Sequence, residues 1–163
     1  MRNRRVAKVI RACQELPGQE LFQYVDDVGE TCNVTSSDVN AYLREITNED
    51  ITAKDFRTWA GTVLAAMALN AQEKFATQKE AKTNVKNAIA AAAKLLRNTP
   101  TICRKCYVHP AIVESYISGN LIEGLQTKLD QAEEIADFSD DERAVLNFLN
   151  GQARKKNVVA MQK

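Results

Sequence analysis

The sequence predicts a mainly α fold with one small β element near residues 21–34. Only three Pro and six Gly occur among 163 residues and Ala is abundant, a composition that favours helices. Apolar residues also recur at helical spacing through most of the chain. The length suits one domain with a sizeable core, so we expect a single domain over residues 1–163 that ends in a flexible tail at 152–163.

The first third of the chain is expected to hold a helix, a β-hairpin and a second helix. Residues 2–15 carry apolar side chains at helical spacing, and their basic residues form either a solvated face or a face for phosphates. Short strands are expected at 21–25 and, from a weaker pattern, at 32–34. The Ser-Ser-Asp cluster at 36–38 is typical of a helix N-terminus, so a helix is expected to follow it.

The rest of the chain is expected to be a series of helices separated by breaks. A capped helix is predicted over 52–68, and the pattern becomes polar over 70–79. Pro100 stops the next helix, because the residue before a Pro avoids the helical region. An acidic connector at 131–137 precedes a capping box at 139–142, which introduces a last helix. The helices between these points are expected at residues 80–96, 102–107, 111–118 and 121–129.

Charge and hydropathy limit the class of protein. A net charge of +1 is low for a DNA-binding protein, so any nucleic-acid interface depends on how the basic residues are distributed. No run of about eighteen apolar residues predicts a transmembrane helix. No apolar segment typical of a signal peptide follows the charged start. We therefore expect a cytoplasmic protein without a membrane partner.

The cysteines do not form a convincing metal site. In the cytoplasm the four cysteines are expected to be reduced thiols. Cys103, Cys106 and His109 have metal-like spacing, but zinc sites usually have four ligands in two separated pairs. The other two cysteines are distant and unpaired in sequence, and the chain has one His. A small buried side chain is therefore the favoured interpretation of Cys106.

Two stretches carry residues that suit chemistry on phosphates. The first is a Lys-x-x-Arg-Thr-Trp pattern that begins at Lys54 on the capped helix. The second is an Asn-Thr-Pro break at Asn98, followed by Tyr-Val-His-Pro at Tyr107. Taken singly, these side chains suit surface charges, a helix C-cap and a packed tyrosine. Together they resemble the catalytic domain of type IB DNA topoisomerases, in the compact bacterial and poxvirus-like branch, over roughly residues 2–119.

The resemblance implies a reaction and a role for each matching residue. In this family a tyrosine attacks duplex DNA and leaves a 3′-phosphotyrosyl link, and the nicked strand swivels and is resealed without ATP or metal. Tyr107 would be the nucleophile, and Arg57 would grip two phosphate oxygens with its planar fork. Asn98 would donate a hydrogen bond to the phosphate, since an amide carries neither charge nor a transferable proton. The expected DNA contacts are Lys54, Arg104 and Lys105, in a monomer.

Two parts of the family's active site have no match in this sequence. The family uses two Arg, one Lys, a His or Asn, and the Tyr. The first Arg lies upstream, and the Lys, the general acid, lies in a β-hairpin between the two Arg. The resemblance begins after that hairpin and does not include the N-terminal clamp domain. We therefore expect the C-terminal portion of such an enzyme, as a fragment, a truncated gene product or the result of a misassigned start, that is inactive alone.

Two other functions remain open. A tyrosine recombinase or integrase remnant would use the same chemistry, but recombinases usually have His at the position of Lys54, and the Val-His-Pro after Tyr107 also disfavours this class. A non-catalytic helical module that binds DNA or a protein partner is favoured by the unmatched Arg and Lys. The basic residues come from separate segments, so only folding can bring them to one surface.

Overall fold

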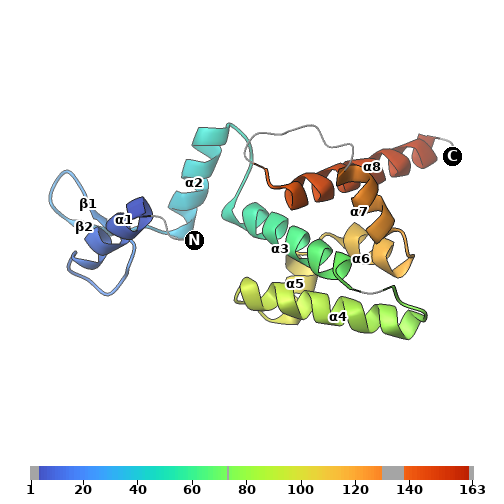
Figure 1. The fold of residues 1–163 in the computed structure, drawn as a ribbon. Coiled ribbons are helices and arrows are strands. Elements are labelled where there is room, and N and C mark those ends of the chain that lie inside the picture. The colour runs from blue at the N-terminus through green and yellow to red at the C-terminus, as the bar shows by residue number, and fades with distance from the viewer. Residues whose placement is uncertain (1–3, 73, 130–137, 162–163) are drawn as a thin grey trace. The chain divides into compact units, whose positions relative to one another are not determined.

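The computed structural model describes residues 4–72, 74–129 and 138–161 (Figure 1). Eight helices and one two-stranded sheet occur among these residues, which confirms the mainly α class. The chain divides into two compact units, Met1–Ala53 and Lys54–Lys163, where the sequence led us to expect one domain. Within the described part, no helix is long and apolar enough to cross a membrane.

The first unit contains the predicted hairpin and two helices. Its elements are α1 (Arg4–Gln14), β1 (Gln23–Val25), β2 (Thr31–Asn33) and α2 (Ser36–Thr47). The strands pair antiparallel, with Tyr24 opposite Cys32. The carboxylate of Asp26 accepts the backbone N–H groups of Val28 at 3.0 Å and Glu30 at 2.8 Å, and these bonds shape the turn. The hairpin predicted near residues 21–34 is thereby confirmed.

Helix α2 is capped at both ends by its own sequence. The N-cap is Thr35, one residue before the predicted Ser-Ser-Asp cluster. Its hydroxyl accepts the backbone N–H of Asp38 at 3.3 Å, and the Asp38 carboxylate accepts the Thr35 N–H at 2.7 Å. Hydrogen bonds from Thr35 lower the pKa of Asp38 below its usual value. The helix ends at Asn48 in the left-handed region, with φ of 54°.

The second unit contains only helices and the loops between them over its described residues. Its helices are α3 (Ala53–Asn70), α4 (Gln78–Leu95), α5 (Pro100–Cys106), α6 (Pro110–Ile117), α7 (Leu121–Leu129) and α8 (Asp140–Met161). Helix α4 packs against α5 and α6, and α7 packs against α8 (Figure 1). The polar break at 70–79 is confirmed, because α3 ends at Asn70. The acidic connector at 131–137 lies outside the described residues.

One apolar core runs through this unit. Small side chains of α3 and α4, among them Ala65, Ala66, Ala88 and Ala92, are almost fully buried in this core. Larger side chains fill the remaining space, and the largest of these are Tyr116, Leu69, Ile112, Leu121 and Leu125. Arg57, Asn98 and Tyr107, the predicted catalytic residues, all belong to this unit, so its packing fixes the elements that carry them.

Helix α8 begins at the predicted capping box and is tied to α3. The backbone N–H and the hydroxyl of Ser139 donate to Glu142, at 3.0 Å and 2.8 Å. The other carboxylate oxygen of Glu142 accepts the indole N–H of Trp59 at 3.2 Å, and Phe138 meets the Trp59 ring edge-on at 6.1 Å. The capping prediction is confirmed. The helix continues to Met161, so residues 152–161, expected to be a frayed tail, are helical here.

Candidate active site

Tyr107 lies where the short helix α5 ends. The Asn-Thr-Pro break places Thr99 at the N-cap and Pro100 in the first turn, where its missing N–H is not needed. The hydroxyl of Thr99 accepts the N–H of Ile102 at 3.3 Å. Tyr107 closes the helix with an N–H donated to the carbonyl of Cys103 at 2.9 Å. A seven-residue helix, capped at both ends, therefore fixes the backbone position from which the partly buried side chain of Tyr107 projects.

The structure brings Arg57 close to Tyr107, the two residues that were expected to be a phosphate-binding cation and a nucleophile. The guanidinium carbon of Arg57 lies 5.1 Å from the centre of the Tyr107 ring. Nη2 of Arg57 donates to the backbone carbonyl of Leu96, at the end of α4, at 2.8 Å. This bond occupies one nitrogen of the planar fork, so the guanidinium can also grip an anion. Arg57 is exposed, which leaves it accessible to a large substrate.

Two threonines of α3 hold the backbone on either side of Tyr107. The hydroxyl of Thr58 donates to the carbonyl of Cys106 at 3.3 Å. The hydroxyl of Thr62, almost fully buried, accepts the N–H of His109 at 3.1 Å and donates to the carbonyl of Tyr107 at 3.4 Å. The helix that carries Arg57 therefore also carries the groups that hold the tyrosine's own segment.

Gly61 completes this contact between α3 and the segment that bears the tyrosine. A Cβ at position 61 would lie 2.4 Å from the carbonyl oxygen of Tyr107, and 3.1 Å from Cδ1 of Leu96. Only a residue without a side chain allows this close approach. Thr58, Gly61 and Thr62 were missed by the sequence analysis, although an isolated Gly inside a helical pattern is a known signal of close packing.

Asn98 does not cap α4, contrary to one of its two predicted interpretations. The helix closes with Leu96 at the C-cap and Arg97 in the left-handed region, at φ of 53°. The N–H of Arg97 donates to Lys94 at 3.3 Å, and that of Asn98 donates to Ala93 at 2.9 Å. This is the hydrogen-bond pattern of a Schellman motif, which normally has Gly where Arg97 stands. The left-handed conformation costs a residue with a Cβ about 1–2 kcal/mol.

The side chain of Asn98 is consequently not needed to end the helix. It is partly buried, and no hydrogen bond joins its amide to another described residue. Asn98 follows Leu96 by two residues, and the Leu96 carbonyl binds Arg57. The backbone thus places Asn98 close to Arg57. Its side-chain amide could donate a hydrogen bond to an acceptor from outside the chain.

The three predicted DNA contacts are all exposed. Lys54 lies in the first turn of α3, three residues before Arg57, and its carbonyl accepts the Thr58 hydroxyl at 2.9 Å. Arg104 and Lys105 lie in the last turn of α5, beside an open hollow of about 600 Å³. These residues give the second unit several accessible cations on the elements that carry Arg57 and Tyr107.

The Cys-His group serves other purposes in the structure. Nδ1 of His109 accepts the backbone N–H of Ala111 at 3.2 Å, so His109 is the N-cap of α6. Cys103 is fully buried, and burial raises the pKa of its thiol. Over the described ranges, no three His, Cys, Asp or Glu side chains are grouped to hold a metal ion.

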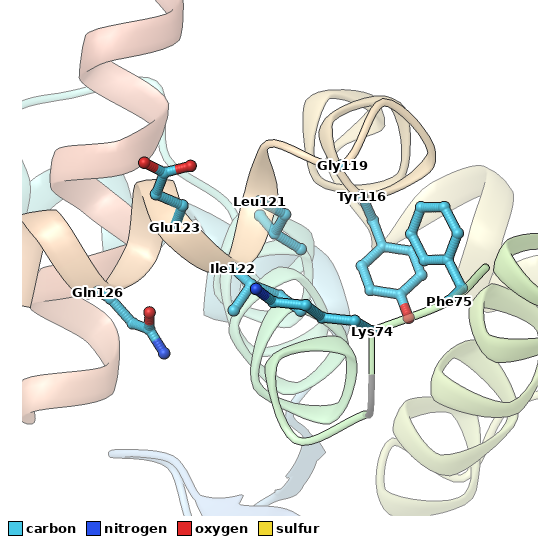
Figure 2. Close-up of a pocket in the computed structure, with 8 residues that line it drawn as sticks. All are labelled: Lys74, Phe75, Tyr116, Gly119, Leu121, Ile122, Glu123 and Gln126. Atoms are coloured by element: carbon cyan, nitrogen blue, oxygen red, sulfur yellow. The ribbon is translucent and has the colours of Figure 1, made fainter.

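A separate pocket lies at the other end of α3. Figure 2 shows it between Lys74 and Phe75, which follow α3, and residues of α6 and α7; its volume is about 370 Å³. Tyr116 forms one wall, with its ring 5.2 Å from that of Phe75. It is almost fully buried, and its hydroxyl accepts a hydrogen bond from Asn84 at 2.9 Å. Tyr116 is therefore unsuited to attack a large substrate, whereas Tyr107 is only partly buried.

Comparisons with known proteins agree with the two motifs. Residues 2–136 match the sequence profile of a family described as eukaryotic DNA topoisomerase I, catalytic core. A curated relative, the DNA topoisomerase 1B of Acanthamoeba polyphaga mimivirus, is 32% identical over 114 residues. That alignment covers 66% of this chain and 34% of the relative, so the chain spans about a third of the length of the relative that it matches.

Proposed function

Because the chain belongs to the topoisomerase I catalytic-core family, we propose that it forms part of a type IB active site in which Tyr107 attacks DNA. The observation that carries the proposal is the Arg57 guanidinium, 5.1 Å from the Tyr107 ring and anchored on the Leu96 carbonyl. A tyrosine used only for packing has no need of an exposed arginine over its ring. A tyrosine that attacks a phosphodiester needs a cation beside it to stabilise charge on the phosphate oxygens.

The proposed reaction is a reversible transfer of one phosphoester bond. The phenol oxygen of Tyr107 attacks the phosphorus as its proton leaves, the bond from phosphorus to the 5′-oxygen breaks, and that oxygen takes up a proton. The product is a 3′-phosphotyrosyl link with a free 5′-hydroxyl. Strand swivelling followed by the reverse reaction relaxes supercoils. Arg57 would bind two non-bridging oxygens and Asn98 would donate to one of them, while Lys54, Arg104 and Lys105 contact neighbouring phosphates.

Residues 1–163 by themselves are proposed to be inactive in plasmid relaxation. Their sequence offers no match to the family's first Arg or to the Lys that protonates the leaving 5′-oxygen. A missing general acid typically lowers the rate by about 10²–10⁴-fold. With few phosphate contacts, DNA binding should also be weak, and its dependence on salt should be shallower than that of a form with more phosphate contacts.

Covalent trapping tests the proposed nucleophile. A duplex from which the downstream piece, with its free 5′-hydroxyl, dissociates after cleavage should accumulate a protein–DNA adduct at Tyr107. The adduct should form slowly with residues 1–163 and faster with any longer form that carries the missing Arg and Lys. Tyr107→Phe should abolish the adduct and bind DNA nearly as before, because only a hydroxyl is lost. Tyr42→Phe is the matched control, since Tyr42 is an exposed tyrosine of the first unit.

Each alternative outcome has a distinct meaning. An adduct that persists in Tyr107→Phe would show that another residue is the nucleophile. DNA binding without any adduct, even in the longer form, would favour the non-catalytic helical module. Relaxation of supercoiled plasmid by residues 1–163 that disappears in Tyr107→Phe would show that an acid and a second cation are supplied from within this chain.

A further inference from the structure

Arg97 occupies a backbone conformation that its side chain disfavours. Its φ is 53°, and in the described part of the chain the one other non-glycine residue with positive φ is Asn48, at 54°. Asn tolerates this region because its short amide bonds locally, and Gly tolerates it because it has no Cβ. Arg has neither property, although Gly would close α4 with the same backbone hydrogen bonds. The strain therefore points to a role for the Arg97 side chain itself.

The position of Arg97 places it next to the proposed phosphate-binding arginine. Arg57 binds the peptide group that joins Leu96 to Arg97, with Nη2 at 2.8 Å from the Leu96 oxygen. Standard peptide dimensions then put the Cα of Arg97 within about 6 Å of that nitrogen. An extended arginine side chain spans a similar length, so both guanidinium groups can reach one anion.

Both arginines lack an ionic partner within the described part of the protein. The ion pairs found there join Arg44 to Asp50 and Arg143 to Asp140, and neither involves Arg57 or Arg97. Both Arg57 and Arg97 are exposed. Two neighbouring cations without a carboxylate repel each other, and a bound phosphate would remove that repulsion. The arrangement is that of an incomplete site that needs an anion.

We propose that Arg97 is a second phosphate-binding arginine, which acts with Arg57 on the DNA backbone at or next to the cleaved phosphodiester. This inference rests on the proposed function and assigns a further cation to its site. It also explains why Arg stands where the backbone favours Gly. The planar fork binds phosphate oxygens bidentately, and Gly at this position would remove that contact.

The test is Arg97→Gly in residues 1–163, because strain and phosphate binding predict opposite effects on two measurements. The melting temperature should rise by about 2–4 °C as the left-handed strain is relieved. Affinity for a fluorescein-labelled duplex at low salt, measured by anisotropy, should fall about fivefold or more. The slope of log affinity against log salt should decrease by about 0.9, the value for one lost phosphate contact.

Three variants separate the contributions. Asn48→Gly relieves the same backbone conformation without a change of charge, so it should leave DNA affinity unchanged. Lys86→Gln removes one exposed charge from the middle of α4 and should have a much smaller effect on affinity. Arg97→Asn removes the charge with a residue that tolerates the left-handed region, so it should weaken binding as Arg97→Gly does.

The results distinguish this inference from the function on which it rests. Wild-type affinity in Arg97→Gly and Arg97→Asn, or an equal loss in Lys86→Gln, would overturn the role of Arg97 and leave the proposal for Tyr107 intact. A lower melting temperature for Arg97→Gly would overturn the strain argument. A wild-type chain that binds no duplex even at low salt would contradict DNA binding by this unit and the role of Arg97 with it.

Discussion

Replacement of Gly61 by Ala tests whether α3 positions Tyr107, the proposed nucleophile. The new Cβ would lie 2.4 Å from the carbonyl oxygen of Tyr107 and 3.0 Å from its Cβ. The first contact is with the backbone, so it cannot be relieved by a rotamer change. Ordinary van der Waals contact needs about 3.4 Å, so α3 and the segment at Tyr107 must move apart by about 1 Å.

The expected magnitude is the difference between two opposing effects. In an unobstructed helix interior, Gly→Ala stabilises by about 0.8–1.0 kcal/mol. Overpacking of a close contact costs about 1–3 kcal/mol, and here the clash also strains the bonds of Thr58 and Thr62 to the same segment. The net result should be a loss of about 1–2 kcal/mol, or roughly 3–6 °C in melting temperature. A 1 Å displacement of a reacting group can lower a rate by about 10²-fold.

Thermal denaturation by circular dichroism, together with adduct formation on a trapping duplex, measures both effects. Gly151→Ala is the matched control, because Gly151 lies in α8 and a Cβ there meets nothing within 4 Å. That control should be slightly more stable than wild type and form the adduct normally. If Gly61→Ala is as stable as Gly151→Ala and equally active, the close approach does not position Tyr107.

Two further substitutions test individual side chains. Asn98→Ala should slow single-turnover cleavage about a hundredfold or more, which corresponds to about 2–4 kcal/mol. Its melting temperature should change little, because Arg97 and backbone groups close α4. Asn98→His should retain activity, whereas an Asn98→Ala variant that cleaves at the wild-type rate but melts at a lower temperature would show that Asn98 has only a structural role. Hydrogen bonds from Ser139 and, to a lesser extent, from Trp59 lower the pKa of Glu142. The charged carboxylate therefore stabilises the fold fully at pH values above the unfolded pKa of about 4.3, and this stabilisation is lost as the pH falls through the folded pKa. Glu142→Gln should therefore be less stable than wild type in urea denaturation at pH 7, with a difference that shrinks below about pH 4; a difference independent of pH would contradict this assignment.

Local sequence patterns predicted the segments that carry the candidate site. Pro100 and the Asn-Thr-Pro break place Tyr107 after a short helix, because Pro excludes its predecessor from helical geometry. Ser139 and Glu142 give the start of α8, since a capping box is a bond between neighbours. The proximity of Arg57 to Tyr107 came from the family resemblance, because no local pattern relates residues so far apart in sequence.

The remaining features depend on contacts or conformations that composition does not reveal. Gly61 and Thr62 contact a segment that lies more than forty residues further along the chain. The periodic pattern of their own helix therefore gives no indication of these contacts. A helix C-cap was one of two interpretations of Asn98, because Asn is common there, whereas Arg97 takes the left-handed position at the end of α4. His109 was considered as a metal ligand, whereas its Nδ1 caps a helix.

The chain's single tryptophan gives the second unit its own optical signal. Trp59 lies two residues after Arg57, with its indole bonded to Glu142 and its ring edge-on to Phe138. Its fluorescence therefore reports the contact between α3 and α8 within the second unit, whereas circular dichroism senses helices in both units. Comparison of the two signals during denaturation would show whether the units unfold together, without any added label.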